Sequence, residues 1–521
     1  MGVLKTIKPS FWLANVQEAG ERLAYFGIRA VLPLMMVSVG AGGLGLSMFQ
    51  KGLIFSVWAL IQCLVPMVSG GFSESFGYKK SIIVAFVINF LGYILMANIL
   101  NVSALLTESA ELNQTVNFWL MMLSGCTIGL GTAIFKPPVG GIVAKSLNEK
   151  NSGLGFGIFY WVVNVGGFLA PLAASALRGT DEAPTWHYVF YGAAIVTVIN
   201  LIVTVKYIKE PAHTEDSPKQ SAGEVFRNTL GVLWHDKMML LFLLIVSGFW
   251  LMFMQLWDLL PNFLDEWVDR RDVGQLFAGT VFTPFLESNG ALKPEMIINI
   301  DAAMILILVI PLSALFSRFR MMTSLSIGMA ISVVGFVMSG MTMSGGIACL
   351  GVVVFAIGEI TCSPKFDEYV GMTAPADKKA IYMGFVNIPF AIGWAVGNLI
   401  SGPLYEQMSS KTKLATQYLV EHGQDSAAIS NYSQEELMAL VQKVSGTGDS
   451  FEATRVLWEA SDPWMIWIVL GAIGFASMGG LIVFYFKSGM AEKDRLASEK
   501  TLAASEDSDA ASGEPDTSDK A

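Results

Sequence analysis

The residues with the most chemistry to offer are charged side chains inside one long apolar stretch, NVQEAGERLAYFGIRAV. Charges within an apolar helix are costly and usually face a cavity or a partner. At about 100° per residue, five side chains fall on one face of this helix: Glu18, Glu21, Arg22, Tyr25 and Arg29. A helix end at a membrane surface is the alternative, but Arg29 lies about three turns deeper than Glu18. We therefore expect this face to point into a helix bundle.

A lone cation, Lys136, lies in the segment LGTAIFKPPVGG, where residues 118–144 carry no other charge. An isolated lysine inside an apolar span needs an anion nearby, and the two glutamates of the first stretch are the candidates. Pro137 and Pro138 follow it directly. Because proline lacks the backbone N–H, we expect them to kink or break the helix.

A deep carboxylate, Glu359, ends a long uncharged run in the segment AIGEITCSPKF. Burial disfavours the charged form of a carboxyl group, so such a group can exchange protons near neutral pH. Ser363 lies one turn further on, and Pro364 is expected to distort the helix there. Glu359 is therefore a candidate proton carrier and a candidate partner for the cationic end of a ligand.

Several other polar residues lie in apolar segments, and each has two interpretations. Asn164 can bond a ligand or a neighbouring helix. A polar, aromatic wall in SGFWLMFMQLWDLLPNF is formed by Trp250, Gln255, Trp257 and Asp258. Asp258 and Asp301 lie near the ends of their segments, so an interfacial position is an alternative for both. We retain these two aspartates as tentative site residues.

The composition indicates an integral membrane protein. Of 521 residues, 53% are hydrophobic and 15% are charged, against about 25% charged in soluble domains. Much of the net charge of −10 lies in the tail at 490–521, which we expect to be disordered. The four cysteines fall in apolar segments and indicate neither disulfides nor a metal site. We expect no metal, no cofactor and no nucleic-acid partner.

Twelve segments are long and apolar enough to cross a bilayer as helices, which need about 20 residues each. They are residues 22–44, 52–73, 80–100, 117–144, 153–177, 186–208, 238–262, 297–316, 321–341, 345–368, 380–404 and 463–487. Lys and Arg favour cytoplasmic loops, and their distribution predicts that both termini are cytoplasmic.

The spans divide into two groups of six, which predicts the repeat architecture of secondary transporters. We expect an N-terminal bundle at 1–209, a cytoplasmic linker at 210–237 and a C-terminal bundle at 238–489. An external loop at 405–462 belongs to the second bundle. Ser433 and Glu436 form a capping-box pattern that predicts a short helix in this loop.

Short motifs along the chain resemble those of a known family. The loop GGFSESFGYKK at 70–80 is similar to the major facilitator signature, with Glu74 in place of aspartate. Five further elements resemble signatures of the proton-dependent oligopeptide transporters of the major facilitator superfamily. They are Glu18-x-x-Glu21-Arg22-x-x-Tyr25, Lys136-Pro137, Phe159-Tyr160-x-x-x-Asn164, Phe249-Trp250 with Gln255, and Glu359-x-x-x-Ser363-Pro364. They occur in the family's order over roughly residues 15–404.

The resemblance implies an all-α membrane protein with two six-helix bundles in the major facilitator fold. It implies a proton-coupling group: Glu18, Glu21, Arg22, Lys136 and Glu359. It also implies a group that binds substrate: Tyr25, Arg29, Lys136, Asn164, Trp250, Gln255, Glu359 and Ser363. Arg29 and Lys136 would take the C-terminal carboxylate of a peptide, and Glu359 its N-terminal ammonium.

Two departures from the family pattern concern the substrate. The usual tyrosine of the second span is missing near Cys63. Met254 precedes Gln255 where the family commonly has an acid, and Asp258, one turn further on, is a candidate to take over that role.

The sequence thus predicts a monomeric, proton-coupled symporter of di- and tripeptides in the inner (cytoplasmic) membrane, working by alternating access. A ligand that bridges both halves gives the differential affinity that a ligand-driven change requires. Two alternatives remain. The same fold could carry another small anion or zwitterion, such as nitrate or an amino-acid derivative, or it could be a proton-antiport exporter. An enzyme is not expected, because no nucleophile–base pair or cofactor loop occurs.

Overall fold

The computed structural model is helical, and its described residues contain isolated β-bridges but no strand. It describes residues 7–490 and 492, except for 40–41, 68, 70–72, 74–75, 108, 149–150, 211–221, 317 and 376–377. Glu74 of the signature loop and nearly all of the acidic tail lie outside the described residues. The predicted all-α fold class is confirmed.

The predicted membrane spans correspond to long helices. Within the described chain, ten helices are long and apolar enough to cross a membrane, and α2 is a shorter apolar helix. The charged helix α1 completes the set of twelve. The first half contains α1 (Pro9–Val37), α2 (Met48–Leu64), α4 (Tyr78–Ala97), α6 (Ala110–Ser146), α7 (Ser152–Leu177) and α8 (Trp186–Tyr207). The second half contains α10 (Lys237–Phe253), α14 (Pro294–Phe316), α15 (Met321–Gly340), α16 (Gly345–Thr373), α18 (Asn387–Met408) and α23 (Met465–Lys487).

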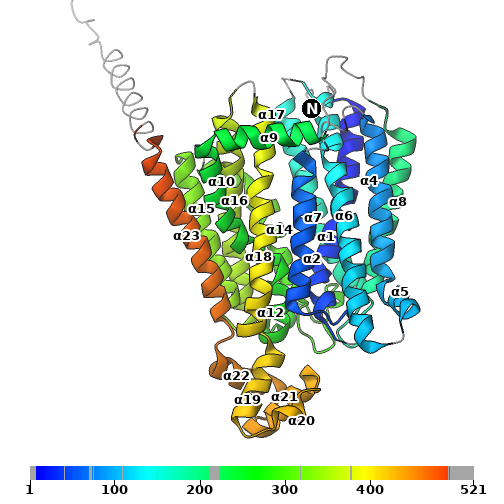
Figure 1. Ribbon diagram of the computed structural model, residues 1–521, viewed down its shortest axis with the longest axis vertical. Coiled ribbons are helices and arrows are strands. Elements are labelled where there is room, and N and C mark those ends of the chain that lie inside the picture. The colour runs from blue at the N-terminus through cyan, green and yellow to red at the C-terminus, as the bar shows by residue number, and fades with distance from the viewer. Residues whose placement is uncertain are drawn as a thin grey trace, which may run out of the picture.

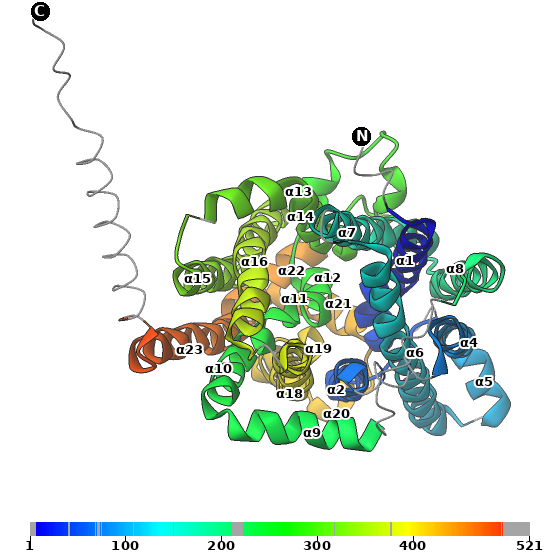
Figure 2. The same cartoon turned by 90° about the horizontal axis from the view of Figure 1, so that it is seen from above.

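The two halves lie side by side and surround a central region (Figures 1 and 2). They meet where α2 packs on α18 and where α7 packs on α14. Glycines allow the first contact: a Cβ on Gly52 would lie 2.3 Å from the carbonyl oxygen of Asn398, and one on Gly402 would lie 2.5 Å from that of Met48. A larger side chain at either position would therefore push the halves apart.

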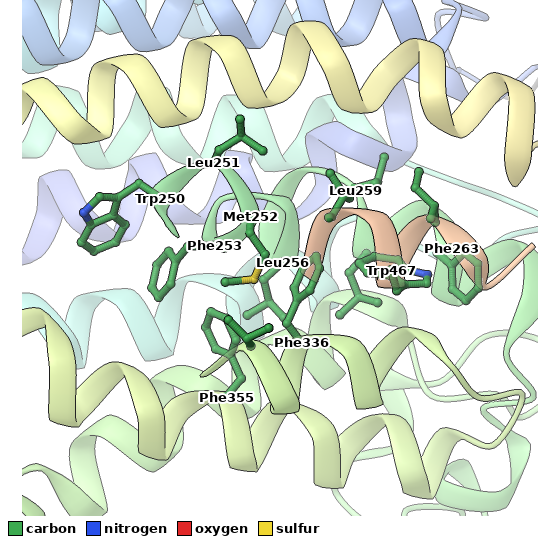
Figure 3. Close-up of a cluster of buried hydrophobic side chains, with 14 of the residues drawn as sticks. Trp250, Leu251, Met252, Phe253, Leu256, Leu259, Phe263, Phe336, Phe355 and Trp467 are labelled. Carbon is green, nitrogen blue, oxygen red and sulfur yellow. The ribbon is translucent and has the colours of Figure 1, made fainter. Parts of the chain in front are cut away.

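The second half has a large core of its own, built from apolar side chains of α10, α15, α16 and α23. Figure 3 shows part of it, where Phe336, Phe355 and Trp467 surround the chain between Trp250 and Phe263. This chain segment, predicted as one span at 238–262, is divided into α10, α11 (Gln255–Asp258) and α12 (Leu260–Trp267). Pro261 lies in the first turn of α12, where proline is tolerated because no N–H is needed.

The expected break at Pro137 and Pro138 is not seen, because α6 continues through both prolines as one helix. Pro137 cannot donate a hydrogen bond to the carbonyl of Ala133, four residues earlier. The hydroxyl of Ser69 donates to that carbonyl instead, at 3.0 Å. A side chain from a neighbouring segment thus replaces the bond that proline removes.

Four helices follow α18 outside the bundle, where one had been predicted: α19 (Lys411–Glu421), α20 (Ser426–Ile429), α21 (Gln434–Ser445) and α22 (Ser450–Ser461). We call the end of the bundle that carries them the capped end. The predicted capping box is confirmed at α21, where the Glu436 amide donates to Ser433 Oγ at 3.2 Å and the Ser433 amide to Glu436 Oε2 at 2.7 Å. At the opposite end, the linker end, α9 (Ala222–His235) lies across the bundle (Figure 1).

Candidate functional site

A cavity of about 180 Å³ lies between the two halves. This volume is below the roughly 300–1,000 Å³ of pockets for drug-sized ligands, so the cavity suits a small ligand. Its walls come from α1, α7, α11, α12, α14 and α16. The polar and aromatic lining residues are Phe26, Arg29, Asn164, Trp257, Glu295, Asn299, Asp301 and Glu359. Five of them were singled out from the sequence: Arg29, Asn164, Trp257, Asp301 and Glu359.

Arg29 gives the cavity a cationic side. Its side chain is 9% exposed, and its guanidinium carbon lies 4.2 Å from the ring centre of Phe55 and 5.0 Å from that of Trp394. Aromatic faces attract a cation and shield it from water. The Nη1 atom is buried and has no partner within the described chain. This donor is therefore available to an anionic ligand group.

Asp258 holds Arg29 in place from the other half. Its Oδ1 forms an ion pair with the Arg29 guanidinium, and its Oδ2 accepts from Trp394 Nε1 at 2.5 Å and from Asn398 Nδ2 at 2.8 Å. Asp258 is buried, and its ion pair with Arg29 joins the two halves. Whether Asp258 takes over the role of the acid missing at Met254 stays a prediction, and its partner in the structure is Arg29.

Lys51 strengthens the same connection and was missed by the sequence analysis, because it precedes the predicted second span by one residue. It is 1% exposed. Its ammonium donates to the carbonyl of Asp258 at 2.7 Å and to Asn262 Oδ1 at 2.6 Å. Asn262 in turn donates to the carbonyl of Pro33 at 2.8 Å. We call the group of Arg29, Lys51, Asp258 and Asn262 the central latch.

Glu359 and Asp301 give the cavity an acidic side, contributed by the second half. Asp301 is 3% exposed and lies on the cavity wall with Glu359. Asn299 lies two residues before Asp301 on the same helix. Its side-chain amide donates to the carbonyl of Phe168 in the other half, at 3.1 Å. The cavity therefore has opposite charges on opposite halves.

The remaining charges of α1 form a separate buried cluster with α6. Lys136 forms an ion pair with Glu18, as its lack of other charged neighbours in the sequence had predicted. Arg22 lies 3.4 Å from Glu18 and donates to Glu21 at 2.6 Å. The hydroxyl of Thr132 donates to Glu21 at 3.1 Å. We call these five residues the acid–base cluster. Two acids and two bases give it no net charge when all are ionised.

Lys136 does not line the described cavity, although the resemblance places it beside Arg29. Its ammonium is committed to Glu18. A carboxylate in the cavity therefore meets Arg29 first. Lys136 can reach a ligand only if its bond to Glu18 is released.

The other predicted residues lie around the cavity but not on its wall. The Tyr25 hydroxyl donates to Gln62 at 2.8 Å, and the Trp250 ring packs on Phe390 with centroids 3.8 Å apart. Gln255 donates to the carbonyl of Leu251 at 3.2 Å. The Ser363 hydroxyl is buried and has no partner within the described chain. The ligand-binding roles of these four residues stay predictions.

Asn164 does line the cavity. Its amide donates to the carbonyl of Tyr160 in its own helix, at 2.9 Å. Its ligand-binding role therefore stays a prediction.

A second connection between the halves was not predicted, because its members lie in loops and at helix ends. Arg178, 2% exposed, follows α7, donates to Glu295 at 2.6 Å and forms an ion pair with Glu287. Lys293 donates to the carbonyls of Ser175 at 2.7 Å and Gly179 at 2.6 Å. Burial raises the pKa of Glu287 above its ordinary value, and Arg178 opposes that shift. We call Arg178, Glu287, Lys293 and Glu295 the peripheral latch.

Replacing Arg178 by glutamine is expected to lower the free energy of unfolding by about 3–5 kcal/mol, the usual cost of leaving a buried charge unpaired. Thermal unfolding of the detergent-purified protein measures the change. The double variant Arg178→Gln, Glu287→Gln should recover most of the loss, because the remaining charges of the latch, Lys293 and Glu295, balance each other. Arg455→Gln, on the exposed face of α22, is the control. An unchanged melting temperature for Arg178→Gln would contradict a structural role for the peripheral latch.

The fold and the site together define a membrane transporter: two helical halves, a small charged cavity between them, and polar latches concentrated toward one end. Residues 21–398 match the Major Facilitator Superfamily. Because this match covers most of the chain, the protein belongs to that superfamily, and it is a multi-pass transporter and not an enzyme.

Known proteins of similar sequence or fold agree with this assignment. The multidrug resistance protein MdtH of Yersinia enterocolitica is 22% identical over 385 residues, which are 74% of this chain and 84% of that protein. The nucleoside transporter NupG has a TM-score of 0.64 at 11% identity, covering 91% of this chain and 100% of that one. A bacterial homologue of the human drug peptide transporters PepT1 and PepT2 has a TM-score of 0.63 at 17% identity, covering 94% and 99%. At these identities the structures establish the fold, and they are consistent with the resemblance to oligopeptide transporters.

Proposed function

We propose that this protein is a proton-dependent oligopeptide transporter that takes up di- and tripeptides together with protons. The observation that carries the proposal is the charge arrangement of the cavity, with Arg29 on one half and Asp301 and Glu359 on the other. A dipeptide is a zwitterion with a carboxylate at one end and an ammonium at the other. A ligand of this kind draws the halves together, which supplies the differential affinity that transport requires.

The acid–base cluster provides the proposed link to protons. A proton on Glu18 or Glu21 removes one negative charge from a buried group that also holds Arg22 and Lys136. The cluster then has an excess positive charge. A proton on Glu18 frees Lys136 directly, and a proton on Glu21 frees Arg22, which can replace Lys136 at Glu18. Lys136 can then turn toward a ligand carboxylate. Proton binding and peptide binding would thereby favour each other.

We propose that the capped end faces outward and that both termini are cytoplasmic, in the inner membrane. Lysines of the connections at the linker end support this orientation, since cytoplasmic loops carry excess Lys and Arg: Lys79, Lys80, Lys145, Lys206 and Lys209. The structure would then be closed to the outside, because the central and peripheral latches lie toward the capped end. We further propose a monomer, with bundles at 1–209 and 238–489 joined by the linker at 210–237.

Uptake into proteoliposomes tests the function. With an acidic exterior and an inside-negative potential, labelled dialanine is expected to accumulate in the vesicles, and a protonophore should abolish the accumulation. Unlabelled dialanine should compete, whereas nitrate should not, because Asp301 and Glu359 repel anions. Failure of dialanine to accumulate, or competition by nitrate, would contradict the proposal.

Export of a cationic compound is a second candidate, because MdtH, a named multidrug resistance protein, is among the similar sequences. The acidic side of the cavity would suit such a cargo. The same vesicles distinguish the two functions when the proton gradient is reversed in separate samples. Proton-driven movement of ethidium opposite to the proton flow, without dialanine uptake, would favour the exporter.

A further inference from the structure

Two acidic side chains from different helices meet in the cavity. Asp301 of α14 and Glu359 of α16 both line it, and their carboxyl groups lie within hydrogen-bonding reach of each other. An ionised carboxylate only accepts hydrogen bonds, so a bond between two carboxyl groups requires a proton on one of them. Two carboxyl groups placed in this way can therefore share one proton. We call Asp301 and Glu359 the carboxyl pair.

No cation neutralises the carboxyl pair within the described chain, where neither acid forms an ion pair. Arg29, the cation of the cavity, is bound to Asp258. Helix α15 packs on α16 and carries no ionisable residue. The titratable neighbours are the weak acids Tyr160 and Cys362. Two adjacent buried carboxyl groups without a cation do not both ionise.

The carboxyl pair also has unused hydrogen-bonding capacity. Asp301 Oδ1 and Glu359 Oε2 are buried and have no partner within the described residues. Buried acceptors without a donor are costly, and Asp301 is 3% exposed. A ligand that carries several N–H donors at one point would satisfy both oxygens. An ammonium group, with three donors and one positive charge, has this chemistry.

We propose that the carboxyl pair stores one proton in the ligand-free protein and exchanges it for the ammonium group of a ligand. With one shared proton the pair has a charge of −1. When an ammonium binds between the acids, the shared proton leaves to the solvent and both acids ionise. Their charge of −2 and the ligand's +1 again sum to −1, so the exchange leaves the charge of the site unchanged. The peptide as ligand rests on the proposed function, whereas the stored proton does not.

The first test needs no ligand. Infrared spectra of the purified protein at neutral pH are expected to show the carbonyl stretch of a protonated carboxyl group. In Asp301→Asn the amide N–H₂ donates to Glu359 and replaces the proton in the bond, so the band should lose the intensity of one carboxyl group. Glu359→Gln should have the same effect and serves as a second variant if the first misfolds. Glu368→Gln is the control, because Glu368 is an exposed acid on the same helix.

The second test measures protons released when dialanine is added to the weakly buffered protein. Per dialanine bound, wild type and Glu368→Gln are expected to release about one proton more than Asp301→Asn, whatever number of protons the acid–base cluster takes up. A wild-type protein without a protonated carboxyl band, or release that is unchanged in both Asp301→Asn and Glu359→Gln, would overturn the proposal. If the band behaves as expected but dialanine does not bind, the stored proton is supported and the proposed function fails.

Discussion

Replacing Glu21 by glutamine is expected to abolish concentrative uptake of dialanine, lowering the accumulation ratio by about tenfold or more, which corresponds to about 1.4 kcal/mol. Glutamine has the size of a protonated glutamate but can neither bind nor release a proton. The acid–base cluster would then keep a permanent excess of positive charge. The proton gradient could then no longer drive uptake through this cluster. Exchange of dialanine across the membrane without a gradient should persist.

We favour Glu21 over Glu18 as the proton carrier, because protonation of Glu21 disrupts fewer ionic contacts. Glu18 contacts both Lys136 and Arg22, whereas Glu21 contacts Arg22 and a neutral hydroxyl. Uptake and counterflow are measured side by side in proteoliposomes. Uptake reports proton-driven accumulation of dialanine, whereas counterflow reports its binding and exchange without a proton gradient. Glu435→Gln, an exposed acid on α21, is the control. Accumulation at the wild-type ratio in Glu21→Gln would contradict the coupling scheme.

Removing Asp258 alone is expected to cost more stability than removing it together with Arg29. Asp258→Asn leaves the Arg29 guanidinium buried without its counter-charge, and breaking a buried pair in this way costs about 3–5 kcal/mol. Arg29→Gln with Asp258→Asn removes both charges, so thermal unfolding should return close to that of wild type. Loosening of the central latch in Asp258→Asn should also favour opening of the capped end.

Transport measurements separate the substrate-binding role of Arg29 from its structural role in the central latch. The double variant should be stable yet fail in dialanine counterflow, because no guanidinium remains to take the ligand carboxylate. Spin labels at Val39 and Met465, two exposed positions toward the capped end, report its opening as a longer distance component. If the double variant transports like wild type, Arg29 belongs to the latch alone and does not bind substrate.

Much of the site could be predicted because buried charge is rare in apolar sequence. The periodicity of α1 placed Glu18, Glu21, Arg22 and Arg29 on one face, and all four side chains are buried. The isolation of Lys136 in its span implied an anionic partner, and Glu18 is that partner. These inferences depend only on helix geometry and on the cost of an unpaired charge, both of which are local properties.

The partners across the two halves could not be predicted in the same way. Arg29 and Asp258 are 229 residues apart, and Arg178 and Glu295 are 117 apart. Several acids and bases could have paired at such separations. Lys51 and Arg178 also lie just outside the apolar runs, where a charge has no cost that would single it out.

By itself, the sequence determined the class of protein, the helical spans and the stripe of charge on α1, because hydrophobic length and helical period act within a segment. Only the tertiary structure decided which charge meets which. It placed Lys136 on Glu18 and away from the cavity, Asp258 on Arg29, and Asp301 against Glu359. The physical reason is that an ion pair or a shared proton depends on the distance between side chains from different helices, and that distance is set by how the two halves pack.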